Sequence, residues 1–408
     1  ASFTAINTSL TSQSAIINVT PTFENAGVSN EGSSETFTIT VNPTAQVEPI
    51  SNQVLCNQEF TEEIIFSTEN TDGITSYSWT NDNVAIGLAS TGDGNISSFV
   101  TADVVASSIS STITVTPTYS NNGISCTGPS EAFTITVNPT AQLESTPNQV
   151  LCHQESTEEI IFSSENTGGT TSYSWINDNV AIGLASTGDG NISSFVTADV
   201  VASSISSTIT VTPTYSNNGI SCTGPSEAFT ITVNPTAQVE SIPNQVLCNQ
   251  EFTEEIMFST ENTDGTTSYS WTNDNVAIGL VSAVGSGNIG SFNATNTTSQ
   301  AQTATFVVTP SYTNNGVSCE GLSETFTITV NPSAQVNEIL NQDLCKGQIT
   351  SPINFSTTNV DGNTEYSWTN DNTNIGLAES GDGNILSFTV LNNSGESEAA
   401  TITVVPTY

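Results

Sequence analysis

The feature that most constrains the fold of this chain is an internal repeat with a period of about 96 residues. The tripeptide Val-Asn-Pro recurs with its asparagine at Asn42, Asn138, Asn234 and Asn331, and a tryptophan recurs at Trp79, Trp175, Trp271 and Trp368. A unit of about 100 residues is long enough to build a hydrophobic core of its own. We therefore expect a string of independent domains rather than a solenoid.

The repeat divides the chain into five segments. These segments are 1–42, 43–138, 139–234, 235–331 and 332–408. The middle three are complete, the first matches only the last part of a repeat, and the last stops before the final strand of a repeat. The first residues read as the middle of a strand, so we expect the chain to be a fragment of a longer protein.

Within the first complete repeat, short runs alternate between apolar and polar residues with a period of two, which is typical of β-strands. The predicted strands are 53–57, 62–67, 76–80, 84–88, 96–101, 112–119 and 131–138. The sequences between them are rich in Asn, Asp and Gly, which tolerate the left-handed backbone of tight turns. About seven short strands with a tryptophan on the third predict an all-β chain, a tandem array of immunoglobulin-like sandwiches.

Two pairs of side chains are predicted to lie in the core of this repeat. Ile64 and Phe66 share one face of their strand, and Tyr77 and Trp79 share one face of theirs. The alternative interpretation is that the aromatic rings form a platform on which carbohydrate stacks.

Charge argues against two classes of partner. The chain has 40 acidic side chains and a single basic one, Lys346, and its net charge is −39. Nucleic acid binding requires clusters of Lys and Arg, and anionic lipid headgroups repel a surface of this sign. No apolar run approaches the roughly 20 residues of a membrane helix, so we expect neither nucleic acid binding nor insertion into a membrane.

The sequence offers no convincing catalytic group, and we predict no catalytic residue and no enzyme. His153 is the only histidine, and its counterparts Asn57 and Asn249 suggest a turn residue that has drifted. The adjacent pair Glu62 and Glu63 recurs in the next two repeats, but neighbouring residues on a strand point to opposite faces. Such a pair cannot converge on one substrate atom, and a solvated strand edge explains it better.

Calcium is the one cofactor that we consider. The sequence Asn81-Asp82-Asn83 recurs in every later repeat, and hard cations take oxygen ligands from such residues. The simpler interpretation is a hairpin turn after the tryptophan strand, and no twelve-residue calcium loop is present. We therefore assign no metal site.

Several longer motifs carry a resemblance to a known family. They are Ser-Tyr-Ser-Trp-Thr-Asn-Asp-Asn, Gly-Asp-Gly-Asn-Ile, Thr-Ile-Thr-Val-Thr-Pro-Thr-Tyr, Asn-Gly-Ile-Ser-Cys-x-Gly and Phe-Thr-Ile-Thr-Val-Asn-Pro. Together they resemble the PKD-like repeats of Bacteroidetes surface proteins, and most of all the giant gliding adhesins of the SprB type. The resemblance covers nearly the whole chain, but Asn30 stands where the second cysteine of a repeat belongs, and Ser286 replaces the Asp of the Gly-Asp-Gly-Asn turn.

That resemblance implies export by the type IX secretion system, a location on the bacterial cell surface, and a role in adhesion or gliding motility. We accordingly predict a monomeric filament segment that acts as a stalk or spacer and holds an adhesive region away from the cell. Its partners would be surface polysaccharide or proteins of the secretion and surface machinery. The alternative function is a multivalent module in which each repeat binds polysaccharide.

Six of the seven cysteines are predicted to form disulfides, because an exported chain experiences oxidising conditions. We expect one bond within each complete repeat: Cys56–Cys126, Cys152–Cys222 and Cys248–Cys319. The expectation places the first strand of a sandwich at the pole that carries the loop between the last two strands. The rival pairing Cys126–Cys152 is disfavoured because a strand would separate the sulfurs by about 25 Å. Cys345 is expected to lack a partner within the chain.

Overall fold

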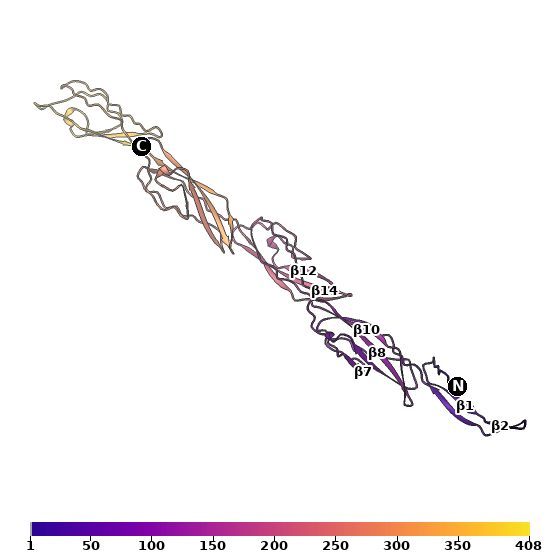
Figure 1. Cartoon of the computed structure of the whole chain (residues 1–408). Helices are drawn as coiled ribbons and strands as arrows, with labels where there is room; N and C mark the ends of the chain where they lie inside the picture. Colours follow the sequence, from indigo (N-terminus) through magenta and orange to yellow (C-terminus); the bar gives the residue numbers. More distant parts are fainter. Residues whose placement is uncertain (1) are drawn as a thin grey trace.

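The computed structural model describes residues 2–408 and shows an all-β chain whose sandwich domains follow one another in a single extended row (Figure 1). We refer to residues 43–138, 139–234 and 235–331 as domains 1, 2 and 3. The fold class predicted from the alternating runs is confirmed.

Each complete domain contains the same series of elements. Domain 1 contains β5 (Gln53–Cys56), β6 (Ile74–Asn81), the 3-10 turn η1 (Val84–Ile86), β7 (Thr91–Asp93), β8 (Ile109–Asn121), β9 (Ile124–Thr127) and β10 (Glu131–Asn138). Domain 2 contains β11 (Gln149–Cys152), β12 (Thr170–Asn177), η2 (Val180–Ile182), β13 (Thr187–Asp189), β14 (Ile205–Asn217), β15 (Ile220–Thr223) and β16 (Glu227–Asn234). Domain 3 contains β17 (Gln245–Cys248), β18 (Thr266–Asn273), η3 (Val276–Ile278), β19 (Val284–Ser286), β20 (Gln302–Asn314), β21 (Val317–Glu320) and β22 (Glu324–Asn331).

The two end segments contain parts of this series. The first has β1 (Gln13–Val19), β2 (Thr22–Asn25), β3 (Val28–Glu31) and β4 (Glu35–Val41). The last has β23 (Glu365–Asn370), η4 (Thr373–Ile375), β24 (Ser380–Asp382) and β25 (Ile402–Thr407). Strand β1 pairs with β4, the hairpin β2–β3 stands apart, and β23 lies between β24 and β25.

One layer of each sandwich is a regular sheet. In domain 1 its order is β5-β10-β8-β6-β7, and β9 also pairs with the long strand β8. Strand β8 is antiparallel to β6, β9 and β10, whereas β5 runs parallel to β10 and sets Cys56 opposite Asn138. The end of β5 therefore lies where the chain leaves the domain.

The opposite layer is held by isolated contacts instead of continuous ladders. Backbone bridges join Phe60 to Val100 and Ile64 to Ile96. Between these bridges the side chain of the buried Thr61 replaces a backbone acceptor, because its hydroxyl accepts the amide of Phe99 at 3.1 Å. The predicted strands 62–67 and 96–101 lie in this layer, but side-chain hydrogen bonds interrupt their pairing.

The expected strand 84–88 is wrong, since this segment contains the 3-10 turn η1. The side chain of Asn83 accepts the amide of Ala85, and Gly87 ends the turn in a left-handed conformation with φ of 101°. The neighbouring segment, predicted to be only a turn, contains strand β7. A Cβ atom on Gly92 in this strand would lie 2.1 Å from the indole of Trp79, so the close packing of the ring requires glycine there.

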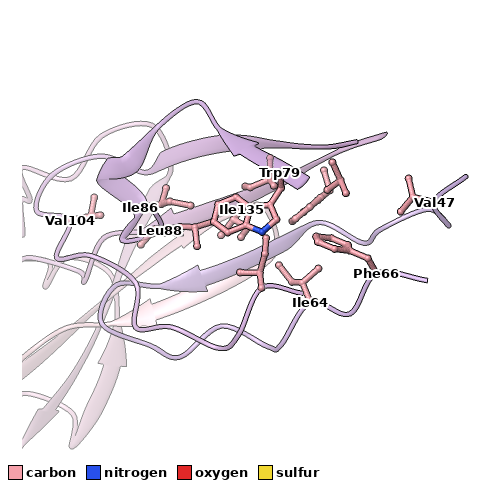
Figure 2. Close-up of a cluster of buried hydrophobic side chains, with 13 residues drawn as sticks. Val47, Ile64, Phe66, Trp79, Ile86, Leu88, Val104 and Ile135 are labelled. Carbon is pink, nitrogen blue, oxygen red and sulfur yellow. The ribbon is translucent and has the colours of Figure 1, made fainter. Parts of the chain in front are cut away.

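The core of domain 1 lies between the two layers, and Figure 2 shows Trp79 at its centre with Ile64 and Phe66 beside it. These three side chains are buried, and Tyr77 packs against Phe66 with ring centroids 5.4 Å apart. The prediction that they are core residues is confirmed. The other repeats build corresponding cores around Trp175, Trp271 and Trp368.

Candidate functional site at the domain junctions

A network of side-chain and backbone hydrogen bonds lies where one domain meets the next. At the junction of domains 1 and 2, Asn138 is fully buried although its side chain is polar. Its amide donates to the backbone oxygen of Asn217 at 3.0 Å, and its oxygen accepts from the Ser108 hydroxyl at 2.8 Å. The Asn217 amide in turn donates to Ser108 at 2.8 Å, so the three side chains join both domains in one network.

A tyrosine from domain 2 closes the same junction. Tyr215 is fully buried at the end of β14, and its hydroxyl donates to the backbone oxygen of Thr167 at 3.0 Å. The same hydroxyl lies 3.1 Å from Ser108 of domain 1. The backbone amide of Thr167 donates to Ala106 at 2.8 Å, which adds a contact independent of any side chain. Buried and mutually satisfied groups of this kind fix one relative orientation of two domains.

Two other junctions repeat these contacts with equivalent residues. Ser12, Asn42, Tyr119 and Asn121 form the network before domain 1, and Ser204, Asn234, Tyr312 and Asn314 form it between domains 2 and 3. In both, the Val-Asn-Pro asparagine donates to the backbone of the next hairpin. Because the geometry repeats, successive domains keep the same relation, and the row in Figure 1 is extended.

Disulfides cross two of these junctions, and the predicted pairing within repeats is wrong. Cys56 of domain 1 bonds to Cys222 of domain 2, with Cα atoms 5.6 Å apart. Cys152 of domain 2 bonds to Cys319 of domain 3, again with Cα atoms 5.6 Å apart.

The predicted pairing failed because it placed Cys56 at the wrong pole. The chain passes Thr134 of β10 at Asn52, whose side-chain oxygen accepts the amide of Thr134 at 2.7 Å, and β5 then runs on parallel to β10, so Cys56 ends beside Asn138 at the exit of the domain. The hairpin that carries Cys126 lies at the entry of the domain, where Asn42 donates to Asn121. The first cysteine of one domain therefore meets the hairpin of the following domain.

The remaining three cysteines are free. They are Cys126, which is partly exposed, and Cys248 and Cys345, which are exposed. The prediction that Cys126 and Cys248 form disulfides is therefore wrong for this chain. Cys345 was expected to be unpaired within it.

The recurring Asn-Asp-Asn sequence has a structural role. Asn81 is buried, its amide donates to the backbone oxygen of Leu88 at 2.9 Å, and its oxygen accepts from the Ser111 hydroxyl. One carboxylate oxygen of Asp82 accepts from Ser111 and from the backbone amide of Thr112, both at 2.8 Å. These bonds hold the pKa of Asp82 below its ordinary value, the Ser111 hydroxyl contributing most.

The other candidate groups are dispersed. Within residues 2–408 no three His, Cys, Asp or Glu side chains gather in a way suited to a metal ion. His153 lies in a turn with Nδ1 3.0 Å from a carboxylate oxygen of Asp199, and Lys346 lies in the equivalent turn and donates to Asn393. Glu62 and Glu63 are both exposed.

Comparisons with known proteins give only distant structural similarity. No family model and no curated protein matches the chain. The human desmocollin-1 ectodomain aligns at 10% identity and a TM-score of 0.29, covering 91% of this chain and 79% of that one. Immunoglobulin domains 1–5 of Sidekick-1 align at 10% identity and 0.27, covering 96% and 94%. The SusE-like polysaccharide-binding protein BT4661 of Bacteroides thetaiotaomicron aligns at 10% identity and 0.21, covering 72% and 62%.

Sequence reasoning missed the junction residues. In the sequence, the Val-Asn-Pro asparagine marks only the period, and Asn121, Asn217 and Asn314 stand in Asn-Asn-Gly sequences that indicate no more than a turn. A signal was present: both recur in step with the serine at Ser12, Ser108 and Ser204.

No helix within residues 2–408 is long and apolar enough to cross a membrane.

Proposed function

We propose that this chain is a stiff spacer in a cell-surface adhesin and holds a binding region at a distance from the cell. The observation that carries the proposal is the junction, in which the buried Asn138 and Tyr215, the half-buried Ser108 and the Cys56–Cys222 bond fix one domain against the next. A flexible tether would have no use for such contacts, whereas a spacer that must keep its reach requires them.

Two covalent connections cross the junction of domains 1 and 2, the backbone at Asn138–Pro139 and the disulfide at Cys56. A single connection leaves two bodies free to twist about it. A second connection beside the first resists both bending and twisting. The same arrangement recurs between domains 2 and 3 through Cys152 and Cys319.

The place of action that we propose is outside the cell. Disulfides persist in oxidising compartments, and both bonds of the structure join neighbouring domains. The resemblance of the repeats to PKD-like units of Bacteroidetes adhesins supports the finer proposal of a bacterial surface protein exported by type IX secretion and used in attachment or gliding. We assign the segment no enzymatic activity and no nucleic acid partner.

The alternative, repeated polysaccharide binding, loses its main support. The recurring ring that could have stacked on sugars, Trp79, lies in the core with only 8% of its surface exposed. We therefore place the adhesive contact in another part of the parent protein.

Small-angle X-ray scattering of the full chain tests the stiffness. We expect the profile of a straight rod, and a more flexible particle for the double variant Cys222→Ser/Cys319→Ser. The matched control is Cys126→Ser/Cys248→Ser, which also removes two thiols but no bond and should keep the rod profile. A profile of freely jointed domains for the unaltered, oxidised chain would contradict the proposal.

A further inference from the structure

The two disulfides overlap along the chain. The loop that the first bond closes runs from Cys56 to Cys222 and contains Cys152, where the second loop begins. The second loop ends at Cys319 and contains Cys222. The two loops therefore share residues 152–222, and the chain cannot be pulled out to its full length while either bond is intact.

We propose that this overlap limits how far the array can be stretched, so that force which unfolds its domains cannot release their full length. The inference concerns the mechanics of the array and stands whether or not the array belongs to an adhesin. It follows from which cysteines are joined and from their places in the fold.

The shortest covalent path through the oxidised chain fixes the limit. The path crosses from Cys56 to Cys222, returns along the backbone to Cys152, and crosses to Cys319. It contains about 70 residues, which at about 3.5 Å each can span at most about 250 Å. Without the bonds, about 260 residues separate the same ends and can span about 900 Å, so oxidation reduces the maximum extension about fourfold.

Because the loops overlap, either disulfide alone still limits how far the array can be stretched. If Cys319 is lost, the Cys56–Cys222 bond remains and the path grows only to about 97 residues. If Cys222 is lost, the Cys152–Cys319 bond gives about 96 residues. Only the loss of both bonds releases the whole length, which distinguishes this arrangement from separate bonds whose losses add.

The fold delivers tension to the bonds directly. Cys56 lies opposite Asn138 in the β5–β10 pairing, next to the point where the backbone passes into domain 2. On the other side, Cys222 is almost fully buried in β15 and paired with Tyr215 of the junction. Force along the row thus reaches each disulfide and the adjacent backbone together.

Stretching single molecules of the full chain in optical tweezers, held by peptide tags at both ends, tests the inference. Full unfolding of the double variant Cys222→Ser/Cys319→Ser should yield about 190 residues more length than the oxidised natural chain. Each single variant should yield only about 27 residues more, and the controls Cys126→Ser and Cys248→Ser should yield no more.

A second measurement is independent of whether the variants fold. Adding a reductant to the natural chain while it is held fully stretched should release the same length, about 190 residues. Single-variant gains of about half that amount, a gain on changing Cys248, or full extension of the oxidised chain would each overturn the inference.

Discussion

Two hairpins of this molecule have identical sequences but different surroundings. Residues 81–138 and 177–234 are the same, yet Cys126 in β9 is free and partly exposed whereas Cys222 in β15 is 3% exposed and bonded. Ile124 is 64% exposed and its counterpart Ile220 only 37%. The difference arises outside the hairpins, since β15 lies against β5 of domain 1, which carries Cys56, whereas residues 1–42, which precede domain 1, contain no cysteine.

The repeat therefore does not specify the bonding state of its own cysteine. The hairpin supplies half of a junction, and the preceding domain supplies the other half. Two copies of the same sequence therefore have the same core but different surroundings at their ends. Matched variants in the two copies separate the contribution of the hairpin from that of the preceding domain.

The largest expected difference concerns the disulfide. Cys222→Ser should destabilise domains 1 and 2 by up to about 5 kcal/mol in the chain-entropy model for so long a loop, whereas Cys126→Ser should have almost no effect. Denaturant unfolding of both variants measures the difference. Peptide mapping without reduction should recover Cys56 joined to Cys222, and equal destabilisation by the two variants would refute the assignment.

The buried asparagine of the junction should give the next largest difference. Asn138 is fully buried with bonds of 2.8 and 3.0 Å, whereas Asn42 is half-buried and donates at 3.3 Å. Asn138→Ala removes the acceptor of the Ser108 hydroxyl and the donor to the backbone oxygen of Asn217, and should cost about 1–3 kcal/mol. Asn42→Ala should cost less. Thermal unfolding of the two variants measures the difference in stability. An equal loss of stability in both would show that burial of the asparagine at the junction does not matter.

A smaller effect is expected from the tyrosine hydroxyl. Tyr215→Phe removes the bonds to Thr167 and Ser108 but keeps the buried ring, and should cost about 0.5–1.5 kcal/mol. Crosslinking or scattering should show a looser junction while the core around Trp175 stays intact. Tyr119→Phe is the matched variant. Its effect should be similar, because the Tyr119 hydroxyl donates to the backbone oxygen of Thr71 at 2.8 Å just as Tyr215 donates to Thr167.

The smallest effect should be the same in both copies. Hydrogen bonds from the backbone of Thr208 and from Ser207 hold the pKa of Asp178 below its ordinary value of 3.8, as similar bonds do for Asp82. A lowered pKa stabilises the fold above that pH and the benefit is lost as the pH falls through the folded value. The advantage of the natural chain over Asp178→Asn should therefore shrink below pH 3.8.

Melting temperatures measured from neutral to acidic pH check this expectation. Asp82→Asn should show the same trend, because the bonded groups belong to the same domain as the aspartate and do not depend on the neighbour. A trend in only one of the two variants would show that the neighbouring domain also affects the stability of this turn.

Much of the fold could be predicted from the sequence, since it depends on local rules. Alternation at a period of two predicted strand 131–138, and the spacing of Ile64, Phe66 and Trp79 predicted their burial. The segment 84–88 failed because its apolar residues fit a strand while the Asn83 cap and the left-handed Gly87 favour a turn.

Taken alone, the sequence determined the period, the β-sandwich class and the residues of each core, because these depend on contacts within one repeat. Tertiary structure alone decided which cysteines meet. The parallel pairing of β5 with β10 carries Cys56 to the exit of its domain, and no periodicity reveals whether a strand joins its sheet in a parallel or an antiparallel direction. Because β5 is parallel to β10, Cys56 bonds to the next domain, and the domains are joined covalently instead of each closing its own disulfide.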